Sequence, residues 1–328
     1  MRIAVTGSIA TDHLMTYQGR FADSLVVDQL DKISLSFLVE ELEVRRGGVA
    51  PNICFGMANL GLHPLLVGGA GADFEDYRAW LERHGVNTAG VLISELKHTA
   101  RFVCTTDSDH AQIATFYSGA MSEARNIELS PIFARSGGVD LVVISANDPE
   151  GMLRHTEECR SRGYAFVADP SQQLAFADGA TIRSLVEGAA YLFSNEYEAA
   201  LIEQKTGWSA QEILERVGVR ITTLGAKGAN IDIKGEEPVH VPVARELRKV
   251  DPTGVGDAFR AGFLAGLAWG VEHRRCAEIG SMLATYVIET VGTQEYELGR
   301  GGFLQRFEAA YGSESAAQIG PHLRCLRP

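Results

Sequence analysis

The second half of the chain alternates short apolar runs with amphipathic segments, and this order restricts the possible fold more than any other feature. A nearly continuous apolar run occupies residues 139–145, further strands are expected at 164–168, 190–194 and 219–224, and helical spacing follows most of them. Such runs are typical of parallel strands covered on both faces. The regular strand and helix order predicts an α/β protein with a doubly wound, mostly parallel sheet flanked by helices.

The first part of the chain follows a different pattern. Residues of about 14–46 and 93–120 contain few helical segments and several partly alternating ones, such as 33–39, 91–106 and 112–117. Alternation of this kind indicates strands with one solvated face. We therefore expect a small β-sheet lid added to an α/β core of residues 1–312. Residues 313–328 have a weak pattern, and we expect a loosely held C-terminal tail.

Charge and cysteine content restrict the partners. The chain has 30 basic and 42 acidic residues, a net charge of −12, which disfavours non-specific binding to nucleic acid or to anionic membranes. The apolar run at the N-terminus is too short for a signal peptide or a membrane span. Five scattered cysteines without a pairing pattern fit reduced thiols. These features predict a cytoplasmic protein that binds neither nucleic acid nor membranes.

A short motif at 251–257 (DPTGVGD) precedes a helix with an apolar stripe. Gly254 and Gly256 allow a tight turn and a close approach of the backbone to a ligand. The free N–H groups and the dipole of a helix start favour an anion there. Asp257 lies in the first turn, where it is either a general base beside a bound phosphate or a capping carboxylate. This stretch alone leaves both interpretations open.

Polar residues follow several of the expected strands. In a doubly wound sheet, ligands bind beyond the carboxyl ends of the strands. The residues at or just past these ends are therefore expected to share one crevice. They are Asp12, Gln172, Gln173, Asn195, Glu198, Thr223 and Gly225.

The glycine pairs do not complete the common nucleotide-binding motifs. A P-loop needs a lysine that Gly254-x-Gly256 lacks, and a dinucleotide fingerprint needs a third glycine. After Gly69-x-Gly71 the place of the third glycine is taken by Phe74, and after Gly254-x-Gly256 it is taken by Phe259.

Three signals together resemble the ribokinase-like (PfkB) family of carbohydrate and nucleoside kinases. They are the motif at 47–52 (GGVAPN), Asn195-x-x-Glu198 and the late DPTGVGD motif, with TLGAKG at 223–228 before the last. The resemblance covers about residues 1–312. Pro252 departs from the polar residue that many members carry, but the acids and glycines are intact.

The resemblance implies roles on the acceptor side. Asp257 would remove the proton from the substrate hydroxyl, while the backbone N–H groups of Gly254, Val255 and Gly256 would hold the transferring phosphoryl group. Sugar hydroxyls would be held by residues near the start of the chain. These are Ser8, Asp12, Gly48 and Asn52. A carboxylate can accept from two vicinal hydroxyls, and an amide can donate and accept.

The resemblance also implies a nucleotide side, with ATP and Mg²⁺ as cofactors. Asn195 and Glu198 would act on Mg²⁺ through water. The ATP site would be lined by Thr223, Gly225, Gly228, Gly256 and Ser281. K⁺ could be held near Asp251 and Thr253. Lys227 is either a phosphate partner or a turn lysine.

The residues leave the acceptor open between a sugar and a nucleoside. Phe102 and Phe116 on either side of a turn either stack on a purine or pack against each other. Gln172 and Gln173 either read a base edge or cap a turn.

Several stretches are similar to adenosine kinases of the actinobacterial type. They are residues 1–15, 34–39, 98–107, 116–127, 168–175 and 251–263. This similarity implies phosphorylation of adenosine by ATP to AMP and ADP, in purine salvage. It also implies a homodimer through the lid sheets, with Ser36 and Phe37 reaching the partner's active site. The alternatives are a fructokinase or ribokinase and, in another class, a nucleoside-binding regulator without catalysis.

Overall fold

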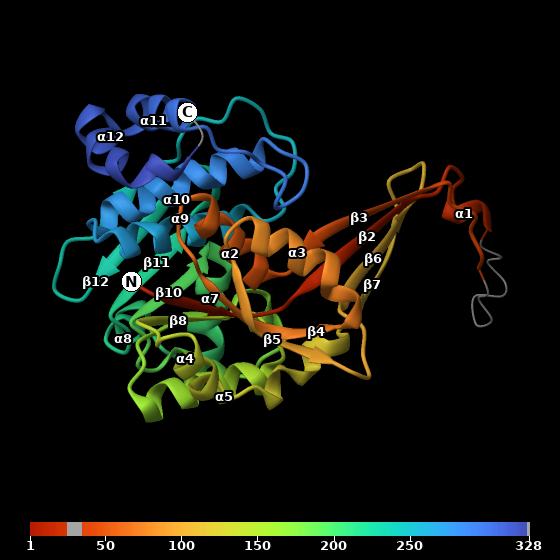
Figure 1. Cartoon of the computed structure of the whole chain (residues 1–328), viewed down its shortest axis with the longest axis horizontal. Helices are drawn as coiled ribbons and strands as arrows, with labels where there is room; N and C mark the ends of the chain where they lie inside the picture. Colours follow the sequence, from red (N-terminus) through yellow and green to blue (C-terminus); the bar gives the residue numbers. More distant parts are fainter. Residues whose placement is uncertain (25–34, 327–328) are drawn as a thin grey trace.

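The computed structural model describes residues 1–24 and 35–326, which form a large and a small β-sheet with helices around the large one (Figure 1). The large sheet has nine strands in the order β13-β12-β11-β10-β9-β8-β1-β4-β5, and the seven from β11 to β5 run parallel. The bounds are β1 Ile3–Thr6, β4 Leu65–Gly71, β5 Asn87–Ser94, β8 Leu141–Ser145, β9 Phe166–Asp169, β10 Tyr191–Asn195, β11 Val219–Thr223, β12 Ala229–Ile233 and β13 Val239–Val241. Strand β12 pairs antiparallel with β11 on one side and with β13 on the other.

Helices cover both faces of this sheet, which confirms the doubly wound α/β prediction. One core cluster holds residues of α2 Val49–Asn59, α3 Glu75–Arg83, α9 Val255–Trp269, α10 His273–Ile288, α11 Arg300–Tyr311 and α12 Ser313–Ile319. A second holds residues of α4 Leu129–Arg135, α5 Pro149–Arg162, α6 Gly179–Val186, α7 Glu196–Thr206 and α8 Ala210–Leu214. Among the described residues, no helix is both long enough and apolar enough to cross a membrane.

Helix α9 is fixed in place by an unusually close contact with α10. A Cβ atom added to Gly262 would lie 2.7 Å from the Cα atom of Gly280. Only glycine at both positions allows the two backbones to approach in this way. The apolar stripe expected from Phe259 and Phe263 is buried as predicted. The N-terminus of α9 is therefore held rigidly at the edge of the large sheet.

The small sheet is the predicted lid, although its boundaries differ. Its order is β3-β2-β6-β7, with bounds Glu41–Gly47, Ala10–Thr16, Ala100–Thr106 and Gln112–Tyr117. Asp12 was expected at or just past the end of a strand but lies within β2. The single strand expected over 91–106 is instead two strands, since β5 ends at Ser94 in the large sheet and β6 belongs to the lid. A run of strand-forming residues does not reveal where the chain changes sheets.

The strand expected over 33–39 is also wrong where it can be described. Residues 35–39 have no regular secondary structure, and Phe37 packs on Tyr17 and Phe21 with ring centroids 4.8 and 4.9 Å apart. This aromatic cluster lies beyond the end of β2, beside the short helix α1 Phe21–Ser24. Packing of the partly buried Phe37 ring there takes the place of strand pairing.

The C-terminal segment is not a loosely held tail. Residues 313–325 form α12 and the 3₁₀ segment η6 Gly320–Cys325. Ala316, Ile319 and Leu323 are buried in the first core cluster. Their spacing of three and four residues places them on one helical face, which is too short a pattern to stand out in the sequence.

Candidate active site

Two cavities meet at the N-terminus of α9. The lid-side cavity, of about 400 Å³, lies between the lid and the large sheet and is lined by Thr253, Gly254 and Asp257 among others. The α10-side cavity, of about 430 Å³, is lined by Pro252, Val255 and Gly256 together with residues of α10. Successive residues of one helix start thus face two different cavities. A group that passes from one cavity to the other must cross this helix end.

The backbone at this helix start requires glycine. Gly254 is the N-cap of α9 with a φ of 76°, and a Cβ atom there would lie 2.7 Å from the side chain of Thr293. Because glycine has no side chain, Gly254 cannot accept a hydrogen bond from the first N–H groups of the helix. These groups and the helix dipole favour an anion at this point.

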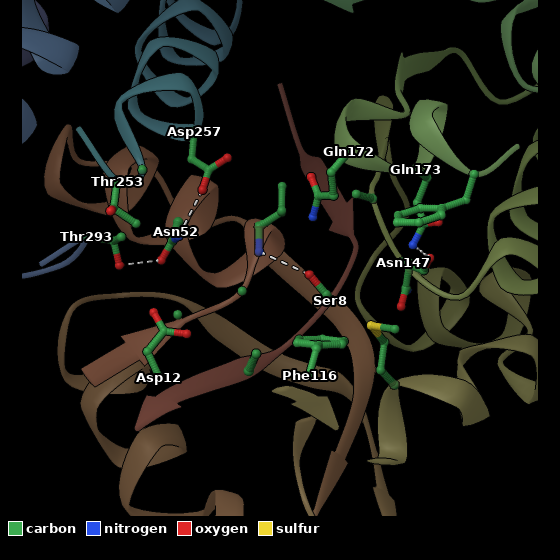
Figure 2. A pocket seen from close by; sticks show the side chains of 18 residues that line it. Ser8, Asp12, Asn52, Phe116, Asn147, Gln172, Gln173, Thr253, Asp257 and Thr293 are labelled. Carbon is green, nitrogen blue, oxygen red and sulfur yellow. Dashed lines mark hydrogen bonds between the residues drawn. The ribbon is translucent and has the colours of Figure 1, made fainter. Parts of the chain in front are cut away.

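Asp257 points into the lid-side cavity beside Asn52 (Figure 2). The amide Nδ2 of Asn52 donates to Asp257 Oδ2 at 2.8 Å. Burial raises the pKa of Asp257 to about 7, and the like charges of Asp169 and Glu198 act in the same direction, against Asn52 and Arg260. A carboxyl group with a pKa near neutrality is suited to take up a proton and release it again.

Asn52 is oriented by two residues that the sequence analysis did not identify. Its Oδ1 accepts from Thr293 Oγ1 and from Gln294 Nε2, both at 2.9 Å. Gln294 also donates to the hydroxyl of Tyr77 at 2.6 Å. These bonds leave the Asn52 Nδ2 directed at Asp257. The only sequence signal was their position after Gly292, a glycine with positive φ.

A second unforeseen group lies behind Asp257. The Arg260 guanidinium, 5% exposed, donates to Asp169 at the end of β9 at 2.6 Å and lies 3.8 Å from Glu198. Asp169 Oδ2 is buried without a hydrogen-bond partner among the described residues. Three carboxylates, counting Asp257, therefore surround one buried cation. Among the described residues no three acidic, histidine or cysteine side chains are placed to hold a metal ion directly, so the orphaned oxygen and the excess of negative charge fit only a divalent cation held through water.

The predicted sugar-binding residues lie together in the lid-side cavity. Ser8, Asp12, Gly48 and Asn52 all line it. Gly48 has a φ of 92°, and a Cβ atom there would lie 2.5 Å from the Ser8 carbonyl oxygen, so the turn requires glycine. Burial raises the pKa of Asp12 to about 6, with Arg45 lowering it and Asp251 raising it.

The predicted ATP residues line the α10-side cavity. They are Asn195, Thr223, Gly225, Gly228, Gly256 and Ser281. Asn195 and Glu198 form a capping box at the start of α7, in which each side chain accepts from the other's backbone N–H at 2.8 Å. Glu198 does not line the cavity itself. Lys227 pairs with Glu196 at 3.5 Å on the surface, which favours the turn-lysine interpretation.

Asp251 does not offer a free carboxylate for K⁺. Its Oδ1 accepts from Thr253 N at 2.9 Å, and its Oδ2 accepts from Gly292 N at 3.1 Å and lies 3.4 Å from the Arg45 guanidinium. Burial opposes ionisation, but these hydrogen bonds and Arg45 together lower the pKa of Asp251. The charge is already balanced, so the geometry does not support the expected K⁺ site.

The two lid phenylalanines are not placed on opposite sides of a ligand. Phe102 and Phe116 are directly paired on β6 and β7, so their side chains leave the same face of the lid. Phe116 lines the cavity, whereas Phe102 does not. Within one chain they cannot form the expected two-sided stack. Ser36 lies in the segment after the undescribed residues, does not line the cavity, and its role at a partner's site stays a prediction.

Gln172 and Gln173 line the cavity as expected, and two further residues accompany them. Asn147 follows β8 and Phe176 follows the 3₁₀ segment η4 Ser171–Ala175. Neither stood out in the sequence, because a single asparagine or phenylalanine in a loop carries no pattern.

Comparison with known proteins agrees with this geometry. The family model described as pfkB family carbohydrate kinase matches residues 5–298. A nucleoside kinase from Methanothermobacter thermautotrophicus is 30% identical over 292 residues, which are 88% of this chain and 93% of the relative. A second nucleoside kinase, from Methanocaldococcus jannaschii, is 28% identical over 89% of this chain and 92% of the relative.

Solved structures extend the similarity to three dimensions. The ligand-free nucleoside kinase of Burkholderia thailandensis superimposes with a TM-score of 0.85 at 36% identity, over 93% of this chain and all of that chain. The same protein in complex with inosine gives a TM-score of 0.82 at 34% identity, over 95% and 99% of the two chains. The match over residues 5–298 and the shared fold establish that the chain belongs to the pfkB family of carbohydrate kinases.

Proposed function

We propose that the chain is a nucleoside kinase that transfers the γ-phosphoryl group of ATP to the 5′-hydroxyl of adenosine, giving AMP and ADP in purine salvage. The observation that carries this proposal is the start of α9, which faces the lid-side cavity through Asp257 and the α10-side cavity through Gly256. An acceptor in the first cavity and ATP in the second would meet at that helix end.

Different residues of the chain remove the proton, stabilise the phosphoryl group and position the acceptor. Asp257 takes the proton of the acceptor hydroxyl, because its raised pKa leaves it basic enough near neutral pH and Asn52 fixes its orientation. The N–H groups of 254–256 and the dipole of α9 stabilise the charge on the transferring phosphoryl group. Ser8 and Asp12 position the sugar hydroxyls.

Mg²⁺ is expected with the nucleotide. Asn195 lines the α10-side cavity, and Glu198 and Asp169 provide the excess negative charge behind it. They would hold the ion through water molecules. When bound, the ion neutralises phosphate charge. Arg260 keeps the carboxylates apart and ties the first turn of α9 to β9 through Asp169.

Aromatic side chains favour a nucleoside over a free sugar. Phe116 and Phe176 line the lid-side cavity while 54% and 85% exposed, and a base can cover their faces whereas a sugar alone does not need them. The Burkholderia thailandensis relative has been solved with inosine and with ADP and inosine. The proposal extends binding of a purine nucleoside to this chain.

A substrate panel tests the proposal. Adenosine, inosine, ribose and fructose are each supplied with ATP and Mg²⁺, and ADP formation is measured. We expect the highest kcat/KM for adenosine. Faster turnover of fructose or ribose would instead support the sugar-kinase alternative. Tight binding of adenosine without any ADP formation would support a non-catalytic regulator.

The proposal includes a homodimer through the lid in the cytoplasm. Leu42, Val44, Ile113 and Tyr117 alternate along β3 and β7 on the face opposite Phe116, and each is between 45% and 58% exposed. An apolar face of this kind is commonly covered by a partner. A second lid would cover it and bring Ser36 near the partner's site. Light scattering of the wild type and of Val44→Asp tests this, and a monomeric wild type contradicts it.

A further inference from the structure

The lid-side cavity contains two groups that the proposed chemistry does not use. Phe176 is 85% exposed, although it lines the cavity. Asn147 is 1% exposed, and neither its Oδ1 nor its Nδ2 has a hydrogen-bond partner within the described part of the chain. An unpaired buried amide is unfavourable, and a phenyl ring exposed on a cavity wall offers its apolar face to a ligand. One ligand could cover the ring and pair with the amide.

These two groups belong to the large domain, across the cavity from the lid. Asn147 follows β8, and Phe176 follows η4. The segment η4 is held to Asn147 because Gln173 Nε2 donates to the main-chain carbonyl oxygen of Asn147 at 2.9 Å. Phe116 comes from β7 of the lid. Figure 2 shows Phe116 on the lid ribbon and Asn147 beside Gln173 on the other element, with the cavity between them. A flat ligand in this cavity would therefore meet one aromatic ring from each structural unit.

We propose that Phe176, with Phe116, encloses the two faces of a purine base and that the side-chain amide of Asn147 pairs with the six-membered edge of that base. This inference rests on the proposed nucleoside kinase function and adds how the base is selected. Phe176 takes the place that the sequence analysis gave to Phe102. The two rings come from separate units, so closing the lid brings them together, which two neighbours on one sheet cannot do.

The free amide has a consequence for specificity. Adenine presents an amino donor and a ring-nitrogen acceptor on this edge, whereas hypoxanthine presents an oxygen acceptor and an N–H donor. The amide of Asn147 has one donor and one acceptor side, and no group within residues 1–24 and 35–326 fixes which way round it points. A half-turn of the amide matches it to either base. We therefore expect 6-amino and 6-oxo purine nucleosides to bind with affinities within about tenfold of each other.

Equilibrium binding tests the assignment. Adenosine, inosine and ribose are titrated calorimetrically into the wild type, Phe176→Ala, Phe176→Tyr and Asn147→Leu. Stacking and paired hydrogen bonds of this kind correspond to about tenfold in affinity each. We expect Phe176→Ala and Asn147→Leu to weaken adenosine and inosine about tenfold, with ribose unchanged, and Phe176→Tyr to stay within about threefold of the wild type.

The matched control is Leu96→Ala, because Leu96 is 91% exposed and lines no described cavity. It should leave all three affinities unchanged. Unaltered nucleoside affinity in Phe176→Ala or Asn147→Leu overturns the base subsite while the kinase proposal stands. An equal loss of ribose affinity also overturns it, since the residue would then support the cavity as a whole. A wild type that neither binds nor phosphorylates a nucleoside overturns the proposed function and this inference together.

Discussion

The large sheet and the lid differ in how they are covered, and the difference matches what each contributes to the site. Every residue of β8 and β9 is buried, whereas all six residues of β7 are exposed. Asp169 and Arg260 are held at the buried sheet by short hydrogen bonds. Phe116 stands on the exposed one. Asp257, the group expected to do the chemistry, lies on α9, which packs against the buried sheet, and the exposed lid contributes Phe116 to the cavity wall.

The largest effect should follow from removing the base on the rigid side. Asp257→Asn should lower kcat by about 10² to 10⁴-fold, the usual contribution of general base catalysis, because Asn cannot take the proton. Adenosine binding should stay close to that of the wild type. The control is Glu75→Gln, another first-turn acid, whose side chain is 81% exposed. Turnover by Asp257→Asn equal to that of the wild type would remove the base assignment.

Substitutions in the core and in the lid should also differ in their effect on the free energy of unfolding. Phe263 is fully buried between α9 and the large sheet, so Phe263→Ala should lower the free energy of unfolding by about 3–5 kcal/mol. Tyr117 on β7 is 45% exposed, and Tyr117→Ala should change the free energy of unfolding of the monomer by less than about 0.5 kcal/mol. Urea denaturation of both variants measures this. Comparable losses would show that the lid is as tightly packed as the core.

The pH profile should report Asp257. Its pKa is raised to about 7, and the base must be ionised, so kcat/KM should fall about tenfold per unit below pH 7 and level off above it. The folded state binds more protons than the unfolded one between about pH 4 and 7. The contribution of Asp257 to stability therefore falls as pH rises through this window. Asp257→Asn should weaken the pH dependence of thermal unfolding between pH 5 and 8, and the part due to the raised pKa of Asp12 should remain.

A smaller effect is expected on the lid. Phe116→Ala should raise the KM for adenosine about tenfold through lost stacking, with kcat little changed. Phe102→Ala should have a weaker effect, since Phe102 does not line the cavity. Steady-state kinetics of both variants decide the order. A larger loss in Phe102→Ala would mean that the lid rearranges on binding more than the present cavity indicates.

The smallest effect concerns monovalent cations. Arg45 lies 3.4 Å from Asp251, so replacing K⁺ by tetramethylammonium should change the wild-type kcat by less than about twofold. Arg45→Met leaves Asp251 without that partner, and its activity should then depend on K⁺. A wild type that loses activity without K⁺ would contradict the charge balance seen around Asp251.

Local motifs allowed the fold and the chemical centre to be predicted. Gly48 and Gly254 both have positive φ, and Asp257 lies in the first turn of α9, as the two glycine motifs indicated. These features depend on neighbours within a few residues, which a sequence displays directly. The roles given to the site residues stay predictions, although the structure places most of them around two adjoining cavities.

Features that depend on distant neighbours were missed. Asn52 is oriented by Thr293 and Gln294, more than 240 residues later. The C-terminal segment was wrongly expected to be loosely held, because its burial depends on a core formed elsewhere. The strand expected at 33–39 was wrong because Phe37 packs on Tyr17 instead.

The sequence by itself determined that the chain has an α/β core and a helix start with an acid in its first turn, where the backbone favours an anion. Tertiary structure decided that Asp257 is buried deeply enough to have a pKa near 7, and that Phe176 rather than Phe102 lines the cavity with Phe116. The reason is physical. Backbone turns and helix dipoles are set by adjacent residues, whereas burial and the facing of two side chains exist only once separate elements have packed together.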